Sequence, residues 1–194
     1  MAASVPGLVC SGLVLLGYCA KQKFTWEGRE LASVSECIAK RPPSWVDRWD
    51  CNRATCWNSE AEAWACVPEQ RKAEFAVFAY RLLPMLFDLS GDGRAIAVDE
   101  LFPRELPALP AGPAPPGYAA LGYDVVERNI VLGTLAFGCS PLSCNGMARE
   151  IPVNQFCLLA EMEDALAAAR RFGMEQPEPG PYVIIEVLTP PVRI

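Results

Sequence analysis

The sequence contains no histidine among its 194 residues. Histidine is the side chain whose ordinary pKa lies between about pH 5 and 8, and it completes the Ser-His-Asp and Cys-His catalytic arrangements and the HExxH zinc motif. Its absence excludes these three kinds of site. Any catalysis by this chain would have to rely on a thiol, a hydroxyl or a carboxylate without an imidazole partner.

Positive charge is also scarce. The chain has 17 Lys and Arg against 23 Asp and Glu, which gives a net charge of -6. An acidic protein repels phosphate backbones, and the most basic stretch, residues 40–53, is interleaved with Asp47 and Asp50. We therefore predict no nucleic-acid partner. The 52% apolar and 21% charged content is that of a chain that folds.

Charged side chains are absent from the first 20 residues. An export signal would need Lys or Arg before its apolar run, whereas here none precedes residues 12–17, and Pro6, Gly7 and Gly12 interrupt the segment. We expect a buried strand over Leu13–Cys19 and no membrane segment. A secreted or anchored chain is the alternative.

Nine cysteines are present, at positions 10, 19, 37, 51, 56, 66, 139, 144 and 157, but no CxxC motif. A chain of this length can build a core without cross-links, so we expect mostly reduced, buried thiols in a cytoplasmic, reducing compartment, with no cofactor. The pairs Cys51/Cys56 and Cys139/Cys144 are spaced too widely for a standard zinc knuckle. A metal-stabilised module nevertheless remains an open alternative.

Capping-box spacing, S-x-x-E, occurs twice in the first half of the chain. Ser33–Glu36 predicts a helix over residues 34–40, and Ser59–Glu62 predicts one ending near Cys66. Residues 74–89 fit both helical and alternating patterns, and Pro84 with the aromatic content favours a strand.

The second half predicts the order β-β-α-β. Residues 121–128 and 130–138 are expected to form a hairpin around Arg128 and Asn129. The helix is expected over Leu159–Phe172, with Gly173 as its cap, and the last strand over Tyr182–Thr189. The fold class predicted for the whole chain is α+β, with a mixed or mostly antiparallel sheet and a few short helices.

Six prolines crowd residues 103–117, which predicts a stiff connector between halves 1–102 and 118–194. Tyr182, Ile184 and Leu188 point to one side of the last strand, and its alternate residues are apolar as well. A strand that is apolar on both faces requires a layer beyond one helix. We therefore predict that the first half covers the second and that the two form one unit.

The loop 139–146 follows a strand and gathers thiols, hydroxyls and an amide. Cys144 is the candidate nucleophile, with Cys139 and Asn145 beside it and Glu186 as a candidate acid or base. A plain turn is the interpretation that we favour for the loop, because Asn-Gly flanked by serine is typical of turns.

Residues 88–99 resemble the calcium loop of the EF-hand and dockerin families. The resemblance implies oxygen ligands from Asp88, Ser90, Asp92 and Asp99, with Gly93 at the sharp turn. It departs from the family pattern at Ala95, where those loops carry a branched aliphatic residue. A β-hairpin turn is the interpretation that we favour.

Function follows from the sequence only in outline. All five tryptophans lie in the first third of the chain and would serve either as binding anchors or as core. Because no complete catalytic set is present, the leading hypothesis is a non-catalytic intracellular protein that binds another protein as a regulator, adaptor or inhibitor. A small enzyme using a cysteine of the 139–146 loop is the alternative.

Overall fold

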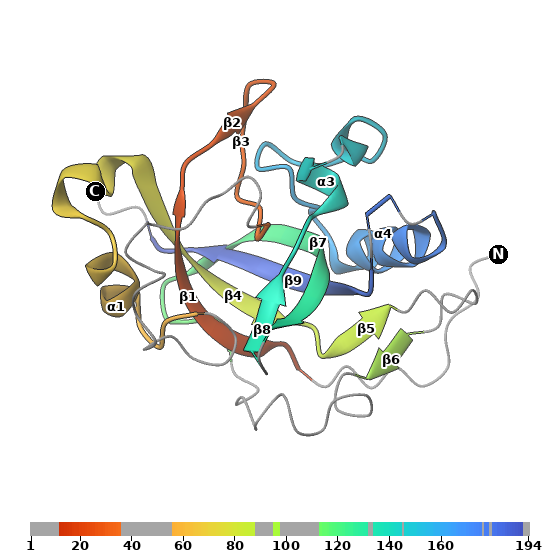
Figure 1. The fold of residues 1–194 in the computed structure, drawn as a ribbon, viewed down its shortest axis with the longest axis horizontal. Helices are drawn as coiled ribbons and strands as arrows, with labels where there is room; N and C mark the ends of the chain where they lie inside the picture. Colours follow the sequence, from red (N-terminus) through yellow and green to blue (C-terminus); the bar gives the residue numbers. More distant parts are fainter. Residues whose placement is uncertain are drawn as a thin grey trace.

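The computed structural model describes residues 12–35, 56–87, 95–97, 113–131, 134–144, 146–175, 177–178 and 180–191, and it has the predicted α+β class. Runs of strands are separated by helices along the chain (Figure 1). The elements are β1 (Val14–Gln22), β2 (Thr25–Trp26), β3 (Arg29–Glu30), α1 (Glu60–Ala65), η2 (Glu69–Glu74), β4 (Phe75–Leu82), β5 (Met85–Phe87), β6 (Ala95–Ala97), β7 (Ala119–Val131), β8 (Thr134–Phe137), α3 (Pro141–Cys144), η3 (Met147–Arg149), α4 (Met162–Glu175) and β9 (Tyr182–Thr189).

One antiparallel sheet organises the molecule. In the described part of the chain it has seven strands. Strand β1 pairs with β4, β4 with β9, β9 with β7 and β7 with β8, while β5 pairs with β9 and β6 with β5. The sheet curls around its own inner face, and a separate hairpin of β2 and β3 projects from it (Figure 1). None of the described helices is long and apolar enough to cross a membrane.

Strand β9 lies in the middle of this sheet and has the bounds that the sequence predicts. It pairs with β7 from Ala119↔Thr189 to Glu127↔Tyr182, and on its other side with β4. Seven of its eight residues are buried, because alternate side chains enter two different cores. The expectation that this strand is apolar on both faces is confirmed.

The two faces are covered by different elements. Helix α4 lies over one face and buries Ala165, Ala169 and Phe172 against Tyr182 and Ile184 of β9. The other face lies inside the curl, where strands β1, β4, β7, β8 and β9 all contribute buried side chains. Helix α1 covers the outside of β1 and β4, far from α4 (Figure 1).

Residues 74–89 contain the strand that the sequence favours. Strand β4 ends at Leu82, Pro84 interrupts the chain, and β5 continues along the same side of β9, where Phe87 pairs with Tyr182. Strand β5 then pairs with β6, Phe87 opposite Ala95. This pairing agrees with the hairpin interpretation of residues 88–99, whose turn itself lies outside the described residues.

The capping-box spacing succeeds at one position and fails at the other. At α1, the Ser59 hydroxyl accepts from the Glu62 amide and the Glu62 carboxylate accepts from the Ser59 amide, as predicted. At Ser33 the hydroxyl instead donates to Asp124, and residues 34 and 35 are not helical. The remainder of that predicted helix falls outside the described part of the chain.

Two predicted boundaries in the second half are wrong. Strand β7 runs through Arg128 and Asn129, and Val131 pairs with Thr134, so the hairpin turns at residues 132–133. Strand β7 continues past Glu127, its last partner on β9, because residues 128–131 pair with β8. Helix α4 begins at Met162 and continues past Gly173, which is a buried helical residue rather than a cap.

Gly122 allows β7 to pass close to the segment before α4. A β-bulge lies between Ala120 and Gly122, and Gly122 has a φ of +143°. A Cβ at this position would lie 2.5 Å from the carbonyl oxygen of Leu159 and 2.9 Å from the Cβ of Leu158. Glycine is required here by both the backbone conformation and the space.

We predict that Gly122→Ala lowers the free energy of unfolding by about 3 kcal/mol, because strain of about 1–2 kcal/mol adds to overpacking of about 1–3 kcal/mol. Two matched variants separate the causes. Gly28 has a φ of +77° but open space around it, so Gly28→Ala should show the backbone strain alone. Gly12 has neither a positive φ nor a close neighbour, so Gly12→Ala should show neither effect. Denaturant unfolding measures all three, and a Gly122 variant no less stable than the Gly28 variant would contradict the close approach.

Candidate functional site

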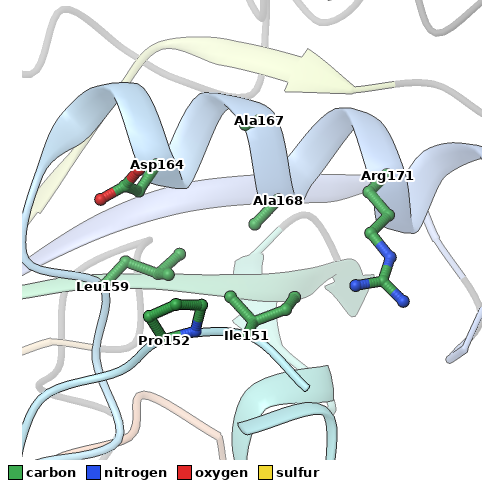
Figure 2. Close-up of a pocket in the computed structure, with 7 residues that line it drawn as sticks. All are labelled: Ile151, Pro152, Leu159, Asp164, Ala167, Ala168 and Arg171. Atoms are coloured by element: carbon green, nitrogen blue, oxygen red, sulfur yellow. The ribbon is translucent and has the colours of Figure 1, made fainter.

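An apolar groove lies between α4 and the segment that precedes it. Ile151, Pro152 and Leu159 form one wall, and Ala168 faces them from α4, with Ala167 at the edge of the groove (Figure 2). The volume of the groove is about 220 Å³. Two alanines on the helix leave this space, because a larger side chain at either position would fill it.

A charged residue of α4 stands at each end of the groove, Asp164 at one and Arg171 at the other (Figure 2). The Arg171 guanidinium is already paired, at 2.9 Å, with each of the carboxylates of Glu150 and Glu175. Together with these two partners of Arg171, which lie beside the groove, the charged groups near it are three carboxylates and one guanidinium, so the local charge is negative.

Met174 extends the apolar surface beyond the groove. It lies three residues after Arg171, hence on the same side of α4, and its side chain is 65% exposed. Methionine adapts to irregular apolar partners and is common at binding surfaces. The groove and Met174 together give α4 an apolar contact strip along one side.

The groove is tied to the sheet through Leu159. Its amide and carbonyl exchange two hydrogen bonds with those of Tyr123 on β7, at 2.9 and 2.8 Å. Nearby, Asn154 donates from its side chain to the Leu121 carbonyl at 2.6 Å. The wall that faces α4 is therefore held in place by the backbone of β7.

Asp124 is the most unusual polar residue of the structure. It is fully buried on the inner face of β7, where its carboxylate accepts from the hydroxyls of Ser33 at 2.9 Å and Ser140 at 2.5 Å and from the Val34 amide at 2.8 Å. The Ser143 hydroxyl donates in turn to Ser33. The cluster thereby joins β7 to two segments that are distant in the sequence.

Burial raises the pKa of Asp124, against the opposing effect of its hydrogen-bond donors. A carboxyl with a raised pKa is a common feature of catalytic sites. Here, however, the group is enclosed by protein on all sides, so it has no contact with a substrate from solvent. Its evident task is to hold the three segments together.

Glu186, a candidate acid or base in the sequence, lies on the other face of the sheet. It forms an ion pair with Arg81 of β4, and Tyr123 of β7 donates to it at 3.4 Å. Burial and the nearby Glu186 charge raise the pKa of Tyr123, which therefore remains a neutral donor. The three side chains form a row across β4, β9 and β7.

Cys139 is not brought near Glu186. Its carbonyl accepts from the Glu127 amide, and Glu127 is opposite Tyr182, whereas Glu186 lies four residues further along β9, about 13 Å at 3.3 Å per residue. The side chain of Cys144 and all of Asn145 lie outside the described residues. Their proposed chemistry stays a prediction.

The calcium-loop candidates Asp88, Ser90, Asp92 and Asp99 also lie outside the described residues, and within the described part no group of three metal-ligating side chains occurs. Of the tryptophans, Trp57 is buried and Trp64 packs partly buried beside it, so both belong to the core under α1. They do not form an exposed binding face.

Sequence reasoning missed both the groove and the Asp124 cluster. The sequence contains one indication of the groove, which is the pair of small residues Ala167 and Ala168 in an otherwise amphipathic helix. It contains another for Asp124, because alternation along β7 places this residue on the same face as the buried Val126. Its partners Ser33 and Ser140 are too distant in sequence to have been paired with it.

Comparison with known proteins gives no match: no family model, no curated protein and no solved structure is similar to this chain. Its function is therefore inferred from its own residues.

The Asp124 cluster yields a stability prediction. Asp124→Asn should lower the free energy of unfolding by about 2–3 kcal/mol, because an amide replaces one acceptor oxygen by a donor that faces hydroxyl and amide donors. Asp164→Asn, on the exposed groove rim, is the control and should change stability by less than about 0.5 kcal/mol. Urea denaturation gives both values.

The same pair of proteins tests the electrostatics of the cluster. Burial raises the pKa of Asp124 in the folded protein above its value in the unfolded chain. The contribution of Asp124 to the free energy of unfolding is therefore full at low pH and is lost as the pH rises through the folded pKa. The stability difference between wild type and Asp124→Asn should therefore shrink with rising pH. A difference that grows with pH would mean that the hydrogen-bond donors outweigh burial.

Proposed function

We propose that this chain is a non-catalytic protein-binding protein, and that the groove beside α4 receives an apolar side chain from a short segment of its partner. The observation that supports this most directly is the groove itself, an open apolar site on a helix with an exposed methionine one turn beyond it. Interfaces are commonly organised around one such anchor in a pocket.

The size of the groove favours a side chain over a small molecule. Pockets for small ligands and cofactors measure about 300–1,000 Å³ and contain several convergent polar groups. At about 220 Å³, with apolar walls, this groove is smaller and offers polar groups only at its ends. It suits one large apolar side chain.

The charge of the rim specifies what should flank that side chain. Asp164, Glu150 and Glu175 outweigh Arg171, and the whole chain carries a net charge of -6. A segment with lysine or arginine next to the apolar anchor would complement this field, and nucleic acid would be repelled. We propose such a basic, apolar segment as the ligand.

The alternative function, an enzyme with a cysteine nucleophile in the 139–146 loop, has less support. The two candidate residues of that site whose side chains the structure describes, Cys139 and Glu186, lie apart. The five cysteines whose side chains the structure describes are thiols, which is consistent with the reducing, intracellular location that we propose for the chain.

Selection of a phage-displayed library of random peptides on the full-length protein tests the proposed function. The peptides enriched should share a large apolar residue flanked by Lys or Arg. Ala167→Trp fills the groove and should weaken binding of a synthetic consensus peptide about 30-fold or more. This factor corresponds to the loss of about 2 kcal/mol of binding free energy, which is typical of one anchoring side chain.

The matched control is Ala61→Trp, which places the same side chain on an exposed alanine of α1, at the other end of the sheet (Figure 1). It should leave the affinity unchanged. Enrichment of no consensus, or binding that survives Ala167→Trp, would overturn the proposed function. Fluorescence anisotropy of the labelled peptide provides the affinities.

A further inference from the structure

Cys19 and Cys56 lie side by side in the core although 37 positions separate them in the sequence. Their sulfur atoms are 3.1 Å apart, Cys19 is 2% exposed and Cys56 is completely buried. Both are thiols in this structure. No spacing motif in the sequence relates these two cysteines, and neither takes part in the groove.

The backbone fixes this pair in register. Tyr18 and Trp57 form an antiparallel bridge and exchange both hydrogen bonds, at 2.9 and 2.8 Å. The next residues, Cys19 and Cys56, are therefore directly opposite each other at a position without hydrogen bonds. In such pairs the Cα atoms lie about 4.5 Å apart, within the 4.4–6.8 Å that disulfides require.

We propose that Cys19 and Cys56 are a redox-active pair that closes to an intramolecular disulfide between β1 and the segment leading into α1. The sulfur atoms need to approach by only about 1 Å to reach the bond length of about 2.05 Å. Because the backbone register already presents the two side chains to each other, bond formation requires no rearrangement of the sheet.

A shared zinc ion accounts less well for the same geometry. Two thiolates on one tetrahedral zinc, each about 2.3 Å from the metal, lie about 3.8 Å apart, which is longer than the 3.1 Å found here. Among the described residues, moreover, no third ligand joins the pair in a metal-binding group.

The oxidant that we propose is a small disulfide such as oxidised glutathione, which reaches the buried pair when the Tyr18–Trp57 bridge opens locally and exposes the Cys56 thiol. A thiolate of the pair attacks one glutathione sulfur and releases reduced glutathione, and the second protein thiolate then attacks the mixed disulfide and releases another. Each turnover forms one protein disulfide and breaks one glutathione disulfide. Two electrons and the two thiol protons pass from the protein to the two glutathione molecules.

Closing this bond would join the start of α1 covalently to β1. In the reduced protein the described contact between Cys56–Trp57 and β1 consists of one bridge and side-chain packing. The disulfide closes a loop whose ends are 37 positions apart, which restricts the unfolded chain and stabilises the fold. The site lies on the β1 side of β4, away from α4, so it does not depend on the proposed binding function.

The test begins with the full-length wild-type protein in glutathione buffers of increasing oxidised fraction. Remaining thiols are blocked with iodoacetamide, and tryptic peptides are examined by mass spectrometry without reduction. We expect peptide 1–21 joined to peptide 54–71, with fragmentation placing the bond between Cys19 and Cys56, while the peptides that contain Cys139 and Cys157 remain alkylated. The oxidised protein should melt several degrees above the reduced protein.

Matched variants exclude the other cysteines of the two peptides. Cys10→Ala and Cys66→Ala should retain the cross-link and the rise in melting temperature, whereas Cys19→Ala and Cys56→Ala should lose both. Should a variant misfold, the wild-type fragmentation spectra still locate the bond.

Three results would overturn the proposal. The first is a wild-type protein whose Cys19 and Cys56 stay alkylated in the most oxidising buffer. The second is a cross-link that survives in Cys19→Ala. The third is stoichiometric zinc, found by elemental analysis of protein purified without chelator and lost in Cys19→Ala, since it would assign the pair to a metal.

Discussion

The fold depends on the burial of β9 on both faces. A strand in this position must have a hydrogen-bonded strand on each edge and an apolar layer on each face. No single stretch of this chain supplies both neighbouring strands and both layers. Strand β7 and α4 come from the second half of the sequence, whereas β4 comes from the first. Both cores therefore assemble only when residues distant in the sequence meet at β9.

The sequence predicts the parts of this arrangement that local rules determine. The bounds of β9 follow from an apolar run between prolines, and α1 follows from Ser59 and Glu62, which satisfy each other's amides within one turn. Ser33 carries the same local signal, but its hydroxyl donates to the buried Asp124, because leaving that carboxylate without donors would cost more than losing one helix cap. Tertiary burial overrides the local preference there.

The candidate sites are less predictable, because each arises between segments that the fold brings together. The groove requires α4 to lie against residues 151–159, and the position of Leu159 is determined by its bridge to Tyr123. Cys19 and Cys56 are opposed only because Tyr18 and Trp57 pair. In both cases the residue types were visible in the sequence, but the register that makes them neighbours was not.

The most direct test of the account is whether residues 117–194 fold without the first half. This fragment retains β7, β8, α4 and β9 but loses β4, so the outer edge of β9 and the inner core would face water. The amide proton resonances of the purified fragment, recorded by NMR beside those of the full chain, provide the measurement. We predict poorly dispersed resonances and no cooperative melting for the fragment alone. Well-dispersed resonances and a sharp transition of its own would contradict the dependence of both cores on β9.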